Sequence, residues 1–177
     1  MVFPELELTG QLGAQAVPLD WEAVYTELLP RVYNYFRYRG LEDTTAEDLT
    51  ALTFEKAWRK RDSYRHNLAA FSTWMLRIAH NVAMDHFRSR PVEITLEDVE
   101  APASQSSPEE LLLEQDDLAC LRRLLASLPL REQELVALKY GSGLTNRTIA
   151  QLTGLSETNV GTILYRVVNH LRKHWEK

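Results

Sequence analysis

The sequence predicts an all-α protein of two small helical domains joined by an acidic flexible linker, with a helix-turn-helix in the C-terminal domain. Apolar residues recur at spacings of three and four along most of the chain, and no stretch shows sustained strand alternation. Residues 91–108 hold three Pro and three Ser without an apolar period, which is typical of a linker. Gly154 and Ser156 separate two short helical patterns, which is typical of a tight turn between helices.

The predicted organisation has four parts. We expect a flexible tail over 1–18, a first helical domain over 19–91, the acidic linker over 92–108 and a second helical domain over 109–177. The charge is unevenly distributed between them. Residues 93–118 carry nine acidic residues and no Lys or Arg, whereas residues after 118 carry nine basic and four acidic residues. The net charge of −5 argues against nucleic-acid binding, but the basic C-terminal segment favours it.

Composition also excludes several classes of protein. The single cysteine, Cys120, has no partner for an intramolecular disulfide. No apolar run approaches the roughly 18–20 residues of a membrane-spanning helix, so we expect no membrane insertion. The chain has no P-loop, no glycine-rich dinucleotide fingerprint and no Cys/His cluster, and His170 and His174 lack a third ligand. We therefore expect neither enzymatic activity nor a cofactor or metal.

Helical patterns and their end signals define the first domain. The patterns cover residues 19–38, 45–61 and 68–90. Asp20 is a plausible N-cap of the first helix and Gly40 follows its end. Pro30 lies inside this helix, so we expect a kink or two helices meeting there. Thr45 and Asp48 have the spacing of a capping box at the start of the second helix.

The helix-turn-helix is the sharpest signal of the second domain, whose helical patterns cover residues 108–128, 131–140, 145–153 and 156–175. The last helix has an apolar face of Val160, Ile163, Leu164, Val167, Val168 and Leu171. Thr158, Asn159, Thr162 and Arg166 lie on the opposite face, where they can meet base edges or phosphates in the major groove. The alternative is a solvated face on a structural helix pair.

Three stretches together resemble the bacterial RNA polymerase sigma factors of the extracytoplasmic-function (ECF) type, in the sigma-70 family. They are residues 46–58 (AEDLTALTFEKAW), 71–88 (FSTWMLRIAHNVAMDHFR) and 128–172. The second is similar to the family form F-x-T-W-L-x-x-I-A-x-N-x-x-x-D-x-x-R, with Met75 in place of the usual Leu. The resemblance covers about residues 20–177. It implies a factor that binds core RNA polymerase and directs promoter-specific transcription initiation in the cytoplasm.

The resemblance also assigns roles to the domains and to single residues. The first domain is expected to bind polymerase and to read and melt the minus-ten element, and the second to read the minus-thirty-five element. The expected polymerase-binding residues are Asp48, Thr50, Ala51 and Glu55, on the outer side of a helix anchored by Leu49, Phe54 and Trp58. The expected melting and minus-ten residues are Tyr64, His66, Asn67, Asn81 and Arg88. Aromatic and hydrogen-bonding groups at one helix junction suit an extruded base.

Partners and rival functions follow from the same resemblance. Core RNA polymerase and promoter DNA are the expected partners, and an anti-sigma protein is a further candidate. The acidic linker is either a plain spacer or a segment that threads the polymerase channel. The sequence departs from the family pattern in several places. Ala51 stands where Gln is frequent, Leu52 where an acid is frequent and Gly161 where Lys is frequent, and only Arg88 and Arg90 follow Asp85 where the family usually has several Arg or Lys. Two alternatives therefore stay open: a stand-alone helix-turn-helix regulator, and a sigma-like interaction protein with reduced promoter reading.

Overall fold

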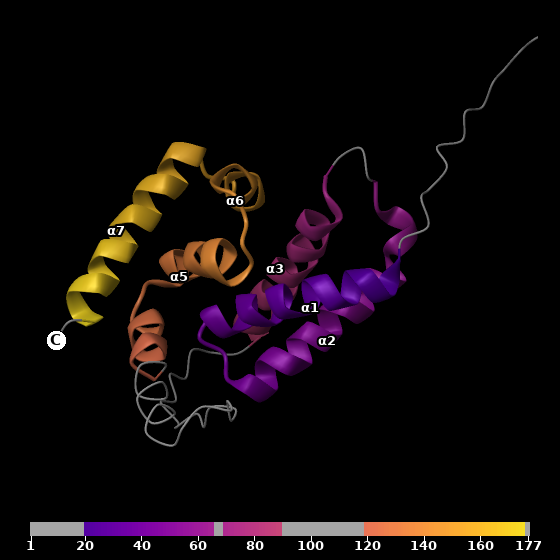
Figure 1. Cartoon of the computed structure of the whole chain (residues 1–177), viewed down its shortest axis with the longest axis horizontal. Coiled ribbons are helices and arrows are strands. Elements are labelled where there is room, and N and C mark those ends of the chain that lie inside the picture. Colours follow the sequence, from indigo (N-terminus) through magenta and orange to yellow (C-terminus); the bar gives the residue numbers. More distant parts are fainter. Residues whose placement is uncertain (1–19, 66–68, 90–118, 176–177) are drawn as a thin grey trace, which may run out of the picture.

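The regular structure of the described residues is entirely helical, as the sequence predicts. In a computed structural model of the chain, the described residues are 20–65, 69–89 and 119–175 (Figure 1). Their elements are α1 (Trp21–Tyr38), α2 (Asp43–Arg59), the short 3₁₀ turn η1 (Arg61–Ser63), α3 (Phe71–Ser89), α5 (Leu130–Val136), the π-helical turn η2 (Ala137–Gly141), α6 (Asn146–Thr153) and α7 (Glu157–Trp175). Residues 119–126 are also helical. The predicted tail and the predicted linker lie outside the described residues.

Local end signals explain where α1 begins and ends. The Asp20 carboxylate accepts hydrogen bonds from the backbone N–H groups of Glu22 and Ala23, as an N-cap should. Gly40 follows the helix at φ +79°, a conformation that glycine adopts without strain. The expectation that the helix divides at Pro30 is wrong, because α1 runs through it as one helix. Pro30 is exposed, and the buried Leu28 and Val32 on either side hold the helix against the core.

The start of α2 corrects the predicted capping box. The helix begins at Asp43, two residues before Thr45, and its N-cap is Glu42. Thr45 is already inside the first turn, where its hydroxyl donates to the Glu42 carboxylate over 3.0 Å. The predicted box had Thr45 before the helix and an acidic residue, Asp48, three positions later. In the structure the acidic Glu42 precedes the helix and Thr45 stands three positions later, so the order of the two residue types is reversed.

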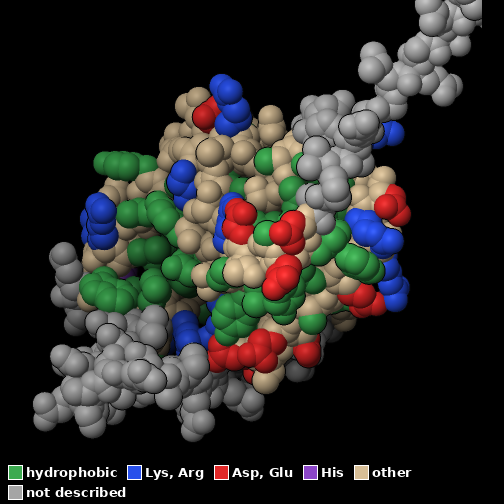
Figure 2. All heavy atoms as spheres, turned by 45° about the vertical axis from the view of Figure 1, so that its right-hand side comes forward, with side chains coloured by type: hydrophobic (Ala, Val, Ile, Leu, Met, Phe, Trp, Pro, Cys, Tyr) green, Lys and Arg blue, Asp and Glu red, His purple; other side chains and the backbone are tan. Residues whose placement is uncertain are grey.

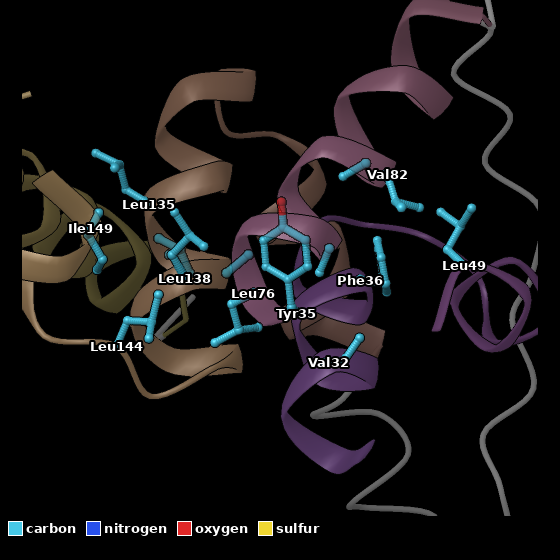
Figure 3. Close-up of a cluster of buried hydrophobic side chains, with 14 of the residues drawn as sticks. Val32, Tyr35, Phe36, Leu49, Leu76, Val82, Leu135, Leu138, Leu144 and Ile149 are labelled. Atoms are coloured by element: carbon cyan, nitrogen blue, oxygen red, sulfur yellow. The ribbon is translucent and has the colours of Figure 1, made fainter. Parts of the chain in front are cut away.

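Both parts of the chain contribute to one apolar core. We call α1, α2, η1 and α3 the N-terminal unit, and residues 119–126, α5, η2, α6 and α7 the C-terminal unit. In Figure 3, Tyr35 and Leu76 of the N-terminal unit lie beside Leu135 and Leu138 of the C-terminal unit, and all four side chains are fully buried. The two units therefore pack along a shared boundary, which we call the seam.

The backbones of η2 and α1 approach each other closely at the seam. A Cβ atom on Gly141 would lie 2.9 Å from the backbone oxygen of Asn34, so only glycine fits there. One turn away along α1, Arg31 Nε donates to the carbonyl oxygen of Ser142 over 2.8 Å. Backbone packing and a side-chain hydrogen bond thus fix η2 against α1.

The partly buried phenol of Tyr33 in α1 predicts loss of stability in alkali. Tyr33 Oη donates to Asp43 Oδ1 over 2.7 Å. Burial, together with this hydrogen bond and the charge of Asp43, raises the pKa of Tyr33 from 10.0 to about 12. The unfolded chain therefore loses this proton first as the pH rises. We expect Tyr33 to contribute stability below pH 10 that is lost progressively between pH 10 and about 12.

Urea unfolding of the wild type and of Tyr33→Phe across this range measures the effect. The difference in unfolding free energy between the two should shrink as the pH rises, since Phe cannot ionise. A difference that stays constant up to pH 12 would contradict the raised pKa.

Candidate nucleic-acid and polymerase interfaces

The helix-turn-helix forms as the sequence predicts. The Thr145 hydroxyl caps α6 by accepting from the backbone N–H of Thr148. Gly154 ends α6 at φ +73°, and the Ser156 hydroxyl accepts from the backbone N–H of Asn159 at the start of α7 over 3.2 Å. The Ser156 cap uses only the backbone N–H of Asn159. The Asn159 side chain therefore remains exposed for other contacts.

The outward face of α7 carries all four predicted upstream-element residues. Thr158, Asn159, Thr162 and Arg166 are exposed, whereas Val160, Leu164 and Val167 on the opposite face are buried. Arg166 is not free, because its Nη2 lies 2.7 Å from Glu132 Oε1 of α5. This ion pair lies within the C-terminal unit and holds the arginine beside the outward face.

Gly161 lies between the two helices of the motif and not on its outward face. A Cβ atom there would meet Asn146 Nδ2 at 3.5 Å, an ordinary contact. Glycine inside a helix costs stability because it has more backbone freedom to lose than alanine. We expect Gly161→Ala to raise the unfolding free energy by about 1 kcal/mol, seen as a higher thermal midpoint.

Gly154→Ala is the matched control for this prediction. A Cβ atom on Gly154 would find open space, but this residue has φ +73°, which alanine rarely adopts. The control should therefore lower the midpoint. A decrease for Gly161→Ala as well would show that α6 and α7 approach too closely for a methyl group.

An aromatic-lined cavity of about 320 Å³ marks the junction between η1 and α3. Its lining residues are Ser63, Tyr64, Arg65, Ala69, Thr73, Trp74, Arg77 and, from α6, Gln151. The ring centroids of Tyr64 and Trp74 are 5.5 Å apart. Tyr64 Oη donates to the backbone oxygen of Ala69 over 3.1 Å, which fixes the phenol ring at the cavity wall. The predicted site residues His66 and Asn67 lie outside the described residues.

Further aromatic side chains contact the two rings that line this cavity. Phe71 contacts both Tyr64 and Trp74 at centroid distances of 4.9 and 5.1 Å. Trp21, at the start of α1, lies 5.7 Å from Phe71 and 4.9 Å from Trp58. The sequence pattern places Trp21 on the first helix but does not connect it with this cavity, since its partners are 37 or more residues away. The prediction that Trp58 anchors α2 in the core is wrong, because its side chain is 50 % exposed.

The remaining minus-ten residues line a second cavity, of about 420 Å³, between α2 and α3. Asn81 and Arg88 reach it from α3, Lys56 reaches it from α2, and Lys60 reaches it from the position just after α2. Asp85 Oδ1 lies 3.7 Å from Arg88 Nη1, the orientation that their spacing of three residues predicts. The structure thus brings Asn81 and Arg88 together with two further basic residues, in a groove separate from the aromatic cavity.

The predicted polymerase-binding face of α2 is exposed with one exception. Asp48, Ala51 and Glu55 are exposed, but Thr50 is only 4 % exposed. The Thr50 hydroxyl donates to the carbonyl oxygen of Ala46 over 2.6 Å, which satisfies it inside the helix packing. Its expected place on the outer side is therefore wrong.

An apolar groove of about 380 Å³ runs beside this face, between α1 and α2. Tyr25 and Phe54 form part of its walls, with ring centroids 5.0 Å apart, and Ala51 and Glu47 lie at its α2 side. Figure 2, which turns the N-terminal unit forward, shows exposed apolar side chains interspersed with acidic groups. An apolar groove with the Glu47 carboxylate among its lining residues suits a protein partner that offers apolar and basic groups.

The part of the chain that the structure describes contains neither a candidate metal site of three or more protein ligands nor a candidate membrane-spanning helix. No group of three or more His, Cys, Asp or Glu residues is arranged to hold a metal ion there. No helix among the same residues is long and apolar enough to cross a membrane.

Family models and relatives agree on what the chain is similar to. The model of sigma-70 region 2 matches residues 24–91, and that of sigma-70 region 4 matches residues 118–171. The ECF RNA polymerase sigma factor ShbA of Streptomyces griseus is 36 % identical, over 95 % of both chains. BldN of Streptomyces coelicolor, another ECF sigma factor, is 34 % identical over 90 % of this chain and 62 % of its own length.

A solved structure gives the same fold. The sigma factor RpoE of Bartonella quintana, in complex with the anti-sigma factor NepR, superposes with a TM-score of 0.72 at 23 % identity. The superposition covers 89 % of this chain and 97 % of that one. Together with the matches of sequence, this assigns the chain to the sigma-70 family of RNA polymerase sigma factors, and within it to the ECF type.

Proposed function

We propose that this sigma factor docks on core RNA polymerase through the outer face of α2, holds an extruded promoter base in the aromatic cavity and reads the upstream element with α7. The observation that carries this proposal is the aromatic cavity at the start of α3. Tyr64 and Trp74 supply ring faces, and Arg65 and Arg77 supply positive charge at the same opening. Stacking surfaces beside cationic groups are what an unstacked base and its phosphate require.

The division of labour follows from what each unit exposes. The N-terminal unit offers the apolar groove with Ala51, the acidic residues Asp48 and Glu55, and the basic groove around Asn81 and Arg88. The C-terminal unit offers α7 with its four outward polar residues. The factor acts through binding energy and catalyses no covalent step. Its place is the cytoplasm with RNA polymerase, and an anti-sigma protein, as in the RpoE–NepR complex, is a candidate partner.

Run-off transcription with purified core polymerase on a genomic fragment library tests the proposal. Start sites that share two upstream elements, and that disappear when the factor is omitted, are expected. A stand-alone helix-turn-helix regulator would bind duplex DNA without polymerase and start no transcription. A sigma-like interaction protein would bind core polymerase, yet leave no promoter footprint in the reconstituted complex.

We expect two residues on the outward face of α7, Asn159 and Arg166, to contribute to promoter binding in different ways. Asn159 lies in the first turn, where a side-chain amide can pair with adenine through two hydrogen bonds. Asn159→Ala should therefore weaken binding by about 1–3 kcal/mol at one base position only. Arg166 lies two turns further on, where we expect it to contact a phosphate. Since every sequence presents the same phosphates, Arg166→Ala should weaken binding to all promoters alike.

Comparing promoter variants at the upstream element for the wild type and both mutants measures this difference. Thr153→Ala, on α6 with its hydroxyl bonded to the Ile149 carbonyl, is a control outside the reading face. A base-specific loss for Arg166→Ala and a uniform loss for Asn159→Ala would reverse the assignment.

A further inference from the structure

Two histidines lie side by side near the end of α7, close to the C-terminus marked in Figure 1. The ring centroids of His170 and His174 are 4.2 Å apart, and the ring planes are inclined by 36°. Their spacing of four residues places both side chains on one side of the helix, one turn apart. Both are exposed, so water reaches them. Two imidazoles at this spacing on one helix face are an arrangement by which helices hold Zn²⁺.

The hydrogen bond of His174 fixes which of its ring nitrogens carries the proton. Its Nδ1 lies 2.8 Å from the backbone oxygen of His170, and a carbonyl oxygen only accepts, so Nδ1 is the donor. The neutral ring then has its lone pair on Nε2. A histidine that binds a metal usually donates its other ring N–H to a carbonyl or a carboxylate in this way. His174 is therefore oriented as a ligand before any ion is bound.

His170 is available to the same ion. Within the part of the chain that the structure describes, its ring contacts His174 and neither of its ring nitrogens makes a hydrogen bond. Zn–N bonds are about 2.0–2.1 Å long, so a tetrahedral ion holds two ring nitrogens roughly 3.3 Å apart. With ring centroids 4.2 Å apart, rotation of the side chains is enough to bring both nitrogens to one ion.

The end of α7 favours a cation and has little else to stabilise it. The last carbonyl groups of a helix carry partial negative charge. Arg172 and Lys173 are nearby cations, but both are exposed, so water and salt screen much of their repulsion. Residues 170 and 172–175 are all exposed, which leaves few packing contacts to hold the last turn. An ion that joins two successive turns would therefore stabilise this helix end.

His80 of α3 shows the contrast with this pair. Its Nδ1 lies 2.9 Å from Oε1 of Glu134, a buried carboxylate at the seam that also accepts from Tyr35 Oη over 2.9 Å. The His80 ring is thus engaged in the packing of the two units. His170 and His174 take part in no such packing, and their rings contact each other at the surface.

We propose that His170 and His174 form a two-histidine site for a divalent transition-metal ion of the class of Zn²⁺, Ni²⁺ and Cu²⁺, with water completing the coordination. Imidazole nitrogen suits these ions, whereas Mg²⁺ prefers oxygen ligands. The expectation from the sequence that no metal binds assumed a third protein ligand, and water takes that place here.

The position of the pair on α7 sets what the ion can affect. The pair continues the row of residues four apart that runs through Thr162 and Arg166. Because α7 has 3.6 residues per turn, this row turns by about 40° around the helix at each step. The ion would therefore lie beside the reading face and not on it. Its expected effect is on the stability of the helix end, which can be measured without polymerase or promoter DNA.

Isothermal titration calorimetry of the full-length factor, prepared without a histidine tag, tests the site. ZnCl₂ and NiCl₂ should each bind at one ion per chain, and MgCl₂ should not bind. His170→Ala and His174→Ala should each lose this binding, because one imidazole cannot chelate. His86→Ala and Cys120→Ser are the matched controls, since they remove other metal-ligating side chains, and both should bind as the wild type does.

A change of register separates chelation from loose binding by single imidazoles. Arg172→His combined with His174→Ala keeps two histidines near the end of α7 but places them two residues apart, where they do not face each other. This variant should lose the ion. Wild-type binding by it, or by either alanine variant, would overturn the site. A stoichiometry of one ion per two chains would overturn water as the remaining ligand, because a second copy would then supply it.

Amide hydrogen exchange gives a second readout, on the helix itself. At a Zn²⁺ concentration ten times the dissociation constant, exchange in the last turn of α7 should slow about tenfold, since binding favours the ordered turn. Exchange in α2 should stay the same, and circular dichroism should show that every variant is folded, because substitutions of exposed residues cost little stability. Unchanged exchange at the end of α7 with the ion bound would place the ion elsewhere and overturn the assignment.

Discussion

Asp48→Arg combined with Glu55→Arg is expected to weaken the binding of core RNA polymerase by several kcal/mol, since like charges brought together at an interface cost that much. Both side chains are exposed on α2, seven residues apart and beside the apolar groove that Ala51 lines. The variant should remain folded. Among the described residues, Glu55 pairs with Arg59, over 2.6 Å between exposed side chains, and such pairs contribute about 0.3–0.5 kcal/mol to stability.

The measurement is titration of core polymerase with labelled factor, next to thermal unfolding of the same samples. Glu22→Arg with Glu27→Arg is the matched control, because these exposed residues of α1 carry the same charge and Glu27 also pairs with an arginine four residues on. The control should bind polymerase as the wild type does. Normal binding by the folded Asp48→Arg, Glu55→Arg variant would show that polymerase uses another surface.

Leu138→Ala is expected to lower the unfolding free energy by about 2–5 kcal/mol, the usual cost of removing a fully buried leucine side chain. Leu138 is 0 % exposed in η2, at the turn that packs against α1. Because the two units share one core, the loss should appear as a single cooperative transition at lower urea, reported equally by probes in α2 and α7.

Leu130→Ala makes the same chemical change at a side chain that is 56 % exposed, and should cost less than about 0.5 kcal/mol. Two separated transitions for the Leu138→Ala variant, one for each unit, would mean that the seam contributes little and that each unit has its own core.

Helices and their ends were predictable because their signals are local. Asp20 caps α1 and Ser156 caps the start of α7 through backbone groups two or three residues away. Thr50 was misplaced for a local reason too. A threonine in a helix can satisfy its hydroxyl with the carbonyl four residues back, and so a polar residue becomes part of the buried face, as Thr53 also does.

The seam could not be predicted, because its partners are far apart in the sequence. Glu134 and Tyr35 are separated by 99 positions, and no periodic pattern connects them. In the sequence, Glu134 is an ordinary acid of a short helix, and its burial depends on how α5 packs against α1 and α3. The aromatic cavity was predicted in part, since Tyr64 and Trp74 are close in sequence, whereas the contributions of Trp21 and Gln151 come from the tertiary fold.

The ion pair between Arg166 and Glu132 affects how the factor searches a genome. A cation that already has a carboxylate 2.7 Å away adds little attraction toward DNA phosphates in general, because it must exchange one anion for another. The exchange costs the same at every sequence, so it weakens the sequence-independent attraction of α7 for DNA. Among the roughly 10⁶–10⁹ competing sites of a genome, weaker capture by random DNA leaves more of the factor free to find its promoters.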